Sequence, residues 1–126
     1  MAGDHLDIII KCRGLLGCKP NIHLGRISRL DGDTVSWRFK TRDGSPPQGT
    51  VEIYFAKLPP LDDDGGRPIP QTITLDKNNN WTSKTFHVRG IVIFPGPFSY
   101  KVTCSMCSGL ELHPDIGDEP QVIIDP

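Results

Sequence analysis

The chain has 126 residues, which is the size of one domain and enough to bury a hydrophobic core. Fourteen basic and fifteen acidic residues give a formal net charge of −1, so nothing indicates a basic surface for nucleic acid or an anionic membrane. No stretch approaches the roughly 20 apolar residues of a membrane span. We therefore expect one domain over residues 1–126, with no membrane span and no nucleic-acid partner.

The first seven residues contain acidic side chains and no apolar segment, so no signal peptide is visible. This feature favours a cytoplasmic protein, with an exported precursor whose signal has been trimmed as the alternative. Four cysteines in a chain without a visible signal favour free thiols or a metal site over disulfides.

Apolar and polar residues alternate with a period of two along most of the chain, which is typical of β-strands. In chain order, this alternation predicts strands at 6–12, 26–30, 34–39, 50–56, 73–75, 81–88, 91–94, 98–104 and 121–125. Turn residues separate these segments, as at Asp31-Gly32 and at the three asparagines 78–80. No helix of normal length is expected. Many short strands in a chain of this length predict an all-β fold, either a two-sheet sandwich or a Greek-key barrel.

Two longer segments, 56–70 and 105–120, lack a regular pattern. Loops of this length usually carry function, because a rigid scaffold can present them to a partner. We expect both loops to form the surface for a protein partner.

Two motifs carry a resemblance to a known family. Gly-Asp-Thr-Val-Ser-Trp at 32–37 starts one strand, and Phe-Pro-Gly-Pro-Phe-Ser-Tyr-Lys-Val-Thr-Cys at 94–104 leads into a strand that ends on a cysteine. Together with the opening strand and a closing strand rich in β-branched residues, this order resembles the cupredoxin (blue-copper) family. The resemblance covers nearly the whole chain and implies a single-domain, cupredoxin-like Greek-key β-sandwich.

The copper ligands that the resemblance implies are incomplete. A type 1 copper site needs two imidazoles, a thiolate and a weak axial ligand. The thiolate position matches Cys104, but segment 46–50, where the first histidine would fall, contains none. Cys107 stands near the position of the second, and His113 lies beyond the usual spacing. Copper is therefore disfavoured.

The resemblance also places the loop after the first strand and the loop after the last cysteine-bearing strand at the same end of the sandwich. This arrangement would bring Cys12 and Cys18 close to Cys104 and Cys107. A Cys-x2-Cys pair is a familiar half of a tetrahedral zinc site, whereas Cys-x5-Cys is a less usual half. His113 or His23 is a replacement candidate for one thiolate.

Three states of the four cysteines remain open at this point. They are buried or free thiols, a zinc site, or disulfides. The disulfides would be Cys12–Cys18 with Cys104–Cys107, or cross pairs between the two segments.

The chain contains no Gly-x-Ser-x-Gly elbow, phosphate loop or His-Glu-x-x-His motif, so nothing supports an enzyme. We expect a non-enzymatic structural or protein-interaction module, without a cofactor, on a cupredoxin-like frame that lacks a complete type 1 copper site. The alternative is a protein that binds zinc, or less favourably copper, through Cys12, Cys18, Cys104 and Cys107.

Overall fold

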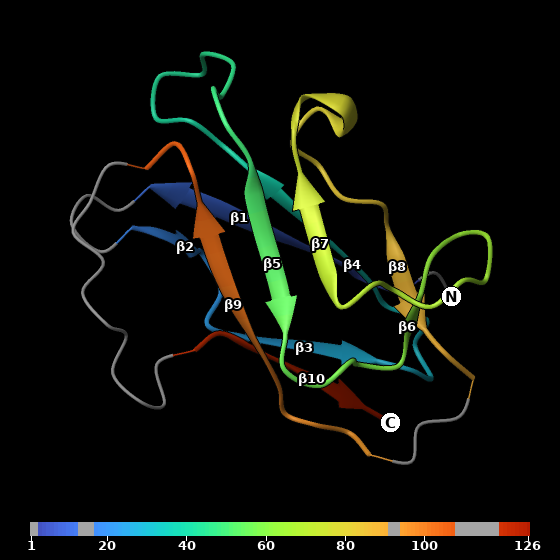
Figure 1. Ribbon diagram of the computed structural model, residues 1–126. Coiled ribbons are helices and arrows are strands. Elements are labelled where there is room, and N and C mark those ends of the chain that lie inside the picture. Colours follow the sequence, from blue (N-terminus) through green and yellow to red (C-terminus); the bar gives the residue numbers. More distant parts are fainter. Residues whose placement is uncertain (1–2, 13–16, 91–93, 108–118) are drawn as a thin grey trace.

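The computed structural model describes residues 3–12, 17–90, 94–107 and 119–126. These residues form ten β-strands in two five-stranded sheets that pack against each other (Figure 1). The predicted all-β sandwich is therefore confirmed.

The first sheet has a parallel pair at its centre, β1 with β4, in which Leu6 lies opposite Val35. The remaining neighbours in this sheet are antiparallel. In spatial order its strands are β2 (Cys18–Pro20), β1 (His5–Cys12), β4 (Thr34–Phe39), β8 (Phe86–Val88) and β6 (Leu61–Asp62).

The second sheet also contains one parallel pair, β3 with β10, at its edge. The long strand β9 lies at its centre and pairs antiparallel with β10 and β5. In spatial order its strands are β3 (Leu24–Ser28), β10 (Gln121–Asp125), β9 (Phe98–Cys104), β5 (Val51–Phe55) and β7 (Thr72–Leu75).

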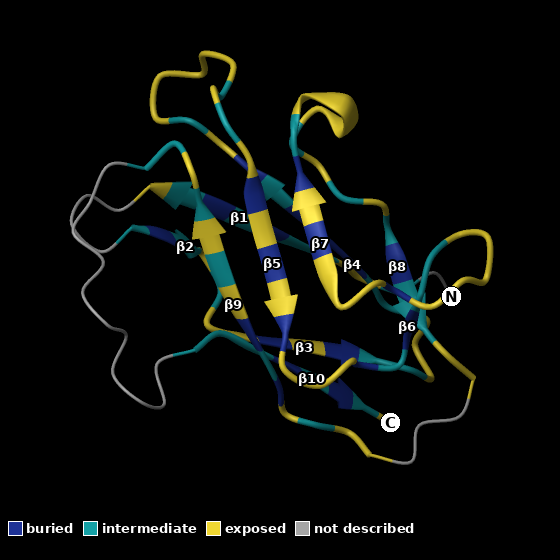
Figure 2. Cartoon of the chain, in the orientation of Figure 1, coloured by how far each residue is buried: buried dark blue, intermediate teal, exposed yellow. Residues whose placement is uncertain are grey.

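The core lies between the sheets, because alternate residues of each strand point inward. Figure 2 shows this alternation as buried and exposed bands along β5 and β7. Trp37 is fully buried at the centre, with the rings of Phe55 and Tyr100 edge-on to it at 5.8 Å. Edge-to-face aromatic pairs of this kind add to the stabilisation that burial provides.

Two polar atoms of this aromatic cluster are buried without a hydrogen-bond partner among the described residues, namely Trp37 Nε1 and Tyr100 Oη. Burial raises the pKa of Tyr100 to about 12, and the neighbouring Trp37 offsets part of that rise. The hydroxyl therefore stays protonated at any physiological pH.

Asp33 connects the two sheets. Its Oδ1 accepts a hydrogen bond of 2.9 Å from the backbone N–H of Asp4, which precedes β1, and its Oδ2 accepts one of 2.8 Å from the N–H of Ser28 in β3. The carboxylate thus satisfies one backbone donor from each layer.

The predicted strand 81–88 is shorter than expected, since only 86–88 form a strand. A 3₁₀ helix at Lys77–Asn79 precedes it, capped by the side chain of Asp76. Asn80 and Trp81 follow with φ of 55° and 52°, so the chain turns sharply at the point where the alternation suggested a strand. Asparagine adopts this conformation readily, but tryptophan does so rarely.

Other predicted boundaries shift by a few residues. The strand expected at 26–30 runs from Leu24 to Ser28, and Leu30 lies in an exposed turn. Residues 91–93 of the strand expected at 91–94 lie outside the described part of the chain, and Phe94 is not in a strand. The strands β2 and β6 were not predicted, because two or three residues are too few to show a period.

Candidate functional site

All four cysteines meet at one end of the sandwich, where they form two disulfides, Cys12–Cys107 and Cys18–Cys104. The Cα atoms of the two pairs are 5.6 Å and 6.0 Å apart. The expected cysteine cluster is therefore confirmed, and its pairing is the cross-paired alternative. The described residues contain no free cysteine, so the preference for free thiols over disulfides was wrong. We call these four residues the cysteine rim.

The strands explain why these residues meet. Cys12 ends β1 and Cys18 begins β2, and the two lie directly opposite each other in the antiparallel β1–β2 pair. Cys104 ends β9 in the other sheet, and Cys107 follows it after a short turn. Both disulfides therefore join the first sheet to the end of β9, at the end of the sandwich where β1 and β9 terminate in Figure 1.

The sulfur atoms form a compact group. The Sγ atoms of Cys18, Cys104 and Cys107 all lie within 4.8 Å of one another. The fourth sulfur, that of Cys12, is bonded to Cys107. In this oxidised form Cys104 offers no thiolate for a type 1 copper ion, since its sulfur is bonded to Cys18. His113, the other predicted ligand, lies outside the described residues, and the predicted zinc site remains a prediction.

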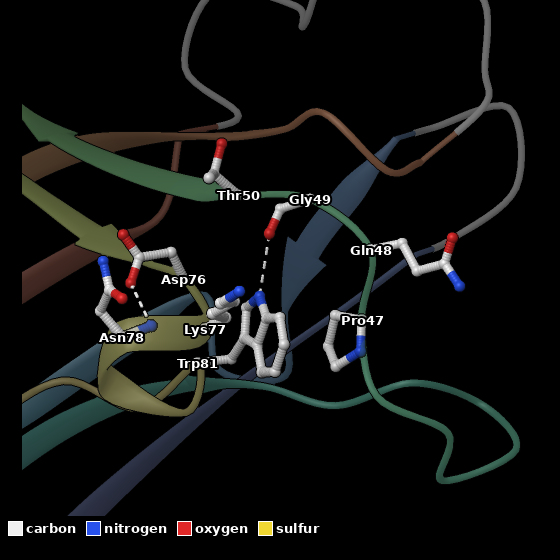
Figure 3. Close-up of a pocket in the computed structure, with 8 residues that line it drawn as sticks. All are labelled: Pro47, Gln48, Gly49, Thr50, Asp76, Lys77, Asn78 and Trp81. Carbon is white, nitrogen blue, oxygen red and sulfur yellow. Dashed lines mark hydrogen bonds between the residues drawn. The ribbon is translucent and has the colours of Figure 1, made fainter.

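A pocket of about 400 Å³ opens beside the cysteine rim, with the indole of Trp81 on its wall (Figure 3). The Trp81 Nε1–H donates a 2.9 Å hydrogen bond to the carbonyl of Gly49, which fixes the ring. Four polar side chains on this wall form no hydrogen bond with the described residues, namely Gln48, Thr50, Lys77 and Asn78. The Asp76 carboxylate, also on the wall, accepts a 2.9 Å hydrogen bond from the N–H of Asn78. Alternation in the sequence does not reveal this pocket, because it predicts a strand at 81–88 that begins with Trp81.

The wall of the Trp81 pocket is attached to the cysteine rim through Ser105. The Ser105 hydroxyl accepts a hydrogen bond of 2.9 Å from the N–H of Thr50, and the Ser105 N–H donates one of 3.0 Å to the Thr50 carbonyl. Gly49 lies so close that a β-carbon there would collide with Ser105 Oγ. Ser105, which lies between Cys104 and Cys107 in the chain, thus connects the rim to the pocket wall by direct contacts.

A second pocket of about 390 Å³ lies at the opposite end of β9, where Phe98 begins the strand. We call it the Leu58–Phe94 groove, after two apolar side chains on it that are 47% and 48% exposed. It is lined by Lys57, Leu58, Pro59, Pro60, Pro68, Ile69, Arg89, Phe94 and Phe98. Loop 56–70, one of the two loops predicted to contact a protein partner, thus contributes most of the lining of an apolar groove.

Aromatic and charged contacts fix several side chains that line the groove. The Phe94 and Phe98 rings meet edge-on at 5.7 Å, and Lys57 Nζ lies 4.6 Å from the centre of the Phe94 ring. Arg89 donates hydrogen bonds to the Asp62 carboxylate, the shorter being 2.8 Å. No carboxylate is among the residues described as lining the groove. The other predicted partner loop, 105–120, lies largely outside the described residues.

Comparisons of the chain with protein-family models, with curated proteins and with solved structures find no significant match. Among the residues that the structure describes, no helix is long and apolar enough to cross a membrane. The site must therefore be interpreted from its own chemistry.

Proposed function

We propose that this protein is a non-enzymatic interaction module that binds a protein partner through the Leu58–Phe94 groove. The observation that carries the proposal is the half exposure of two large apolar side chains on one groove. Exposed apolar patches on a soluble domain commonly mark interaction sites. The chemistry expected of a catalytic centre, a nucleophile beside a base, is absent from the lining residues of this groove.

The groove favours an extended segment of the partner that carries both apolar and acidic side chains. Lys57 supplies positive charge, and no carboxylate is among the described residues that line the groove. Arg89 is already paired with the Asp62 carboxylate, so Lys57 is the main cation for an acidic side chain of the partner. Three prolines in the lining have no backbone N–H to offer, so recognition depends on side-chain contacts rather than on strand addition. An apolar side chain of the partner would pack between Leu58 and Phe94. An acidic side chain of the same partner segment would place its carboxylate near Lys57.

The remainder of the molecule acts as a rigid support in this proposal. Two disulfides tie the sheets together at the cysteine rim, so the groove is presented by a frame with little freedom to deform. The parallel pairing of the opening strand β1 with the Gly-Asp-Thr-Val-Ser-Trp strand β4 supports a cupredoxin-like frame. Two disulfides also favour an oxidising compartment over the cytoplasm that the N-terminal sequence favours.

Selection from a displayed library of short peptides tests this proposal. We expect the immobilised protein to enrich peptides with acidic residues next to Leu, Phe or Pro, and we expect these peptides to bind at least tenfold more weakly after Leu58→Ser with Phe94→Ser. Leu30→Ser is the matched control, because Leu30 is 73% exposed and does not line the groove. No enrichment, enrichment of basic peptides, or equal binding by the double variant would overturn the proposal.

A further inference from the structure

We propose that reduction of both disulfides converts the cysteine rim into a tetrahedral zinc site with four thiolate ligands. The site would use Cys12, Cys18, Cys104 and Cys107. This proposal is independent of the groove, which lies at the other end of β9.

The positions of the sulfur atoms carry the proposal. Four thiolates bound to zinc at about 2.3 Å lie about 3.8 Å from one another. Three of the sulfurs here are already within 4.8 Å of one another, and the fourth is bonded to one of those three. Sulfurs in a disulfide lie about 2 Å apart. Once both bonds are broken, the sulfurs of Cys12 and Cys107 and those of Cys18 and Cys104 each need to separate by about 2 Å to accommodate the ion.

The backbone would keep the sulfurs together after reduction. Cys12 and Cys18 are direct partners in the β1–β2 pair, which is held by backbone hydrogen bonds and not by a bond between these two cysteines. Cys104 is held in β9, where it lies opposite Val51 of β5, and Cys107 follows it at Cys-x2-Cys spacing. Each half of the site is therefore organised without the disulfides. Cys18 is only 9% exposed, so the ion would be partly shielded from water.

The redox step needs an external thiol or phosphine reductant. A thiol reductant gives each disulfide two electrons and two protons and is itself oxidised to a disulfide. A phosphine gives two electrons, while one water molecule supplies the two protons and the oxygen of the phosphine oxide. Either way, each protein disulfide yields two thiols. Zn²⁺ then displaces four thiol protons to solvent. The metal replaces two covalent cross-links between the sheets with four coordinate bonds, so the oxidised and the zinc-bound forms hold the same segments together.

Cobalt substitution tests the proposal directly. The protein is reduced with a phosphine without oxygen, separated from the reductant, and titrated with Co²⁺. We expect one Co²⁺ per chain, with thiolate-to-cobalt charge-transfer bands in the near ultraviolet and the visible bands of a tetrahedral ion. One equivalent of Zn²⁺ should remove these bands, and the oxidised protein should show none. Four titratable thiols without cobalt bands at stoichiometric metal would overturn the proposal.

Two variants identify the ligands. Cys12→Ser should weaken zinc binding by about 100-fold or more, because even outer-shell changes at metal sites cost 10–100-fold. Met106→Leu is the matched control, since it removes a neighbouring soft sulfur and should leave binding unchanged. Circular dichroism separates binding from folding: if reduction loosens the sheet, added Zn²⁺ should restore the β spectrum. Unchanged binding by the Cys12 variant, or loss of binding by the Met106 variant, would contradict the four-thiolate site.

Discussion

Cys12 lies directly opposite Cys18 in the β1–β2 pair, yet each is bonded to a cysteine at the end of β9 or just beyond it. The two disulfides therefore join the same two short segments, 12–18 and 104–107. Their sequence separations are 95 and 86 residues, but the loops that they close are not independent. With one bond intact, the other closes a ring of only eleven residues, seven from 12–18 and four from 104–107.

This shared geometry predicts a strong non-additivity of disulfide removal. Replacing Cys18 and Cys104 by alanine should lower the free energy of unfolding by about 2.5 kcal/mol, because the remaining bond already closes the long loop. Removing both disulfides should cost about 7 kcal/mol. Denaturant titration of the two paired-alanine variants and the four-alanine variant measures these values. Two single-bond losses that sum to the loss of both bonds would contradict this account.

Asp33 should be important for the contact between the sheets. Asp33→Ala removes the acceptor for the N–H groups of Asp4 and Ser28, and we expect a loss of about 2 kcal/mol in the free energy of unfolding. Asp31→Ala is the control, because the exposed Asp31 side chain forms no hydrogen bond with the described residues. Equal stability of the two variants in denaturant titrations would show that the bridge contributes nothing.

Tyr100→Phe should leave the protein as stable as before or stabilise it by up to about 1 kcal/mol, because the buried hydroxyl has no hydrogen-bond partner in the described part of the chain. Tyr54→Phe is the control, since the exposed Tyr54 hydroxyl accepts a 3.0 Å hydrogen bond from Gln71. A loss of more than 1 kcal/mol in the Tyr100 variant would indicate that its hydroxyl is satisfied in solution.

The same hydroxyl predicts an alkaline pH dependence. The pKa of Tyr100 is raised to about 12 in the folded protein, against about 10 for an unfolded chain. The folded state therefore binds more protons than the unfolded state between these values, and its stability falls as the pH rises from 10 to 12, by about 2 to 3 kcal/mol in all. Tyr100→Phe should flatten this part of the stability curve. If the free energy of unfolding falls by the same amount in both proteins, other titratable groups cause the fall.

Gly49 should tolerate no side chain. Gly49→Ala places a β-carbon against Ser105 and within 3.2 Å of Met106 Cβ, so we expect a loss of about 1 to 3 kcal/mol in the free energy of unfolding. Gly90→Ala is the control, because its β-carbon meets no atom within 4 Å and its φ is not positive. If the loss in free energy of unfolding disappears when Ser105 is also replaced by alanine, the collision is with the Ser105 side chain. If Gly49→Ala is as stable as the original protein, the predicted collision does not occur.

Much of the fold could be predicted because one face of most strands is buried. In β5 the inward residues Val51, Ile53 and Phe55 alternate with exposed ones, and a period of two is then visible in the sequence. The alternation at Trp81 was misleading for a local reason. The Asp76 cap and the two positive φ angles at 80 and 81 impose a turn that side-chain polarity alone does not reveal.

The candidate sites were predictable only in part. The strand order that the cupredoxin resemblance implied was enough to bring Cys12 and Cys18 near Cys104 and Cys107. It did not decide the pairing, because three of the sulfurs lie within 4.8 Å of one another and the fourth is bonded to one of these. At such distances, register and turn geometry select the partners. The Leu58–Phe94 groove combines the predicted loop 56–70 with Phe94, which was expected to lie in a strand. Contacts between segments that are distant in the chain leave no periodic pattern in the sequence, so the groove could not be predicted.

The bond between Cys18 and Cys104 closes a covalent ring that contains every residue lining the groove and the Trp81 pocket. A protease that cuts one peptide bond between residues 19 and 103 would therefore release no fragment. The nicked molecule would keep its mass on a non-reducing gel and would separate into two pieces only in a reducing one. In an oxidising environment, cleavage of an exposed loop would leave the groove and the Trp81 pocket attached to the same molecule.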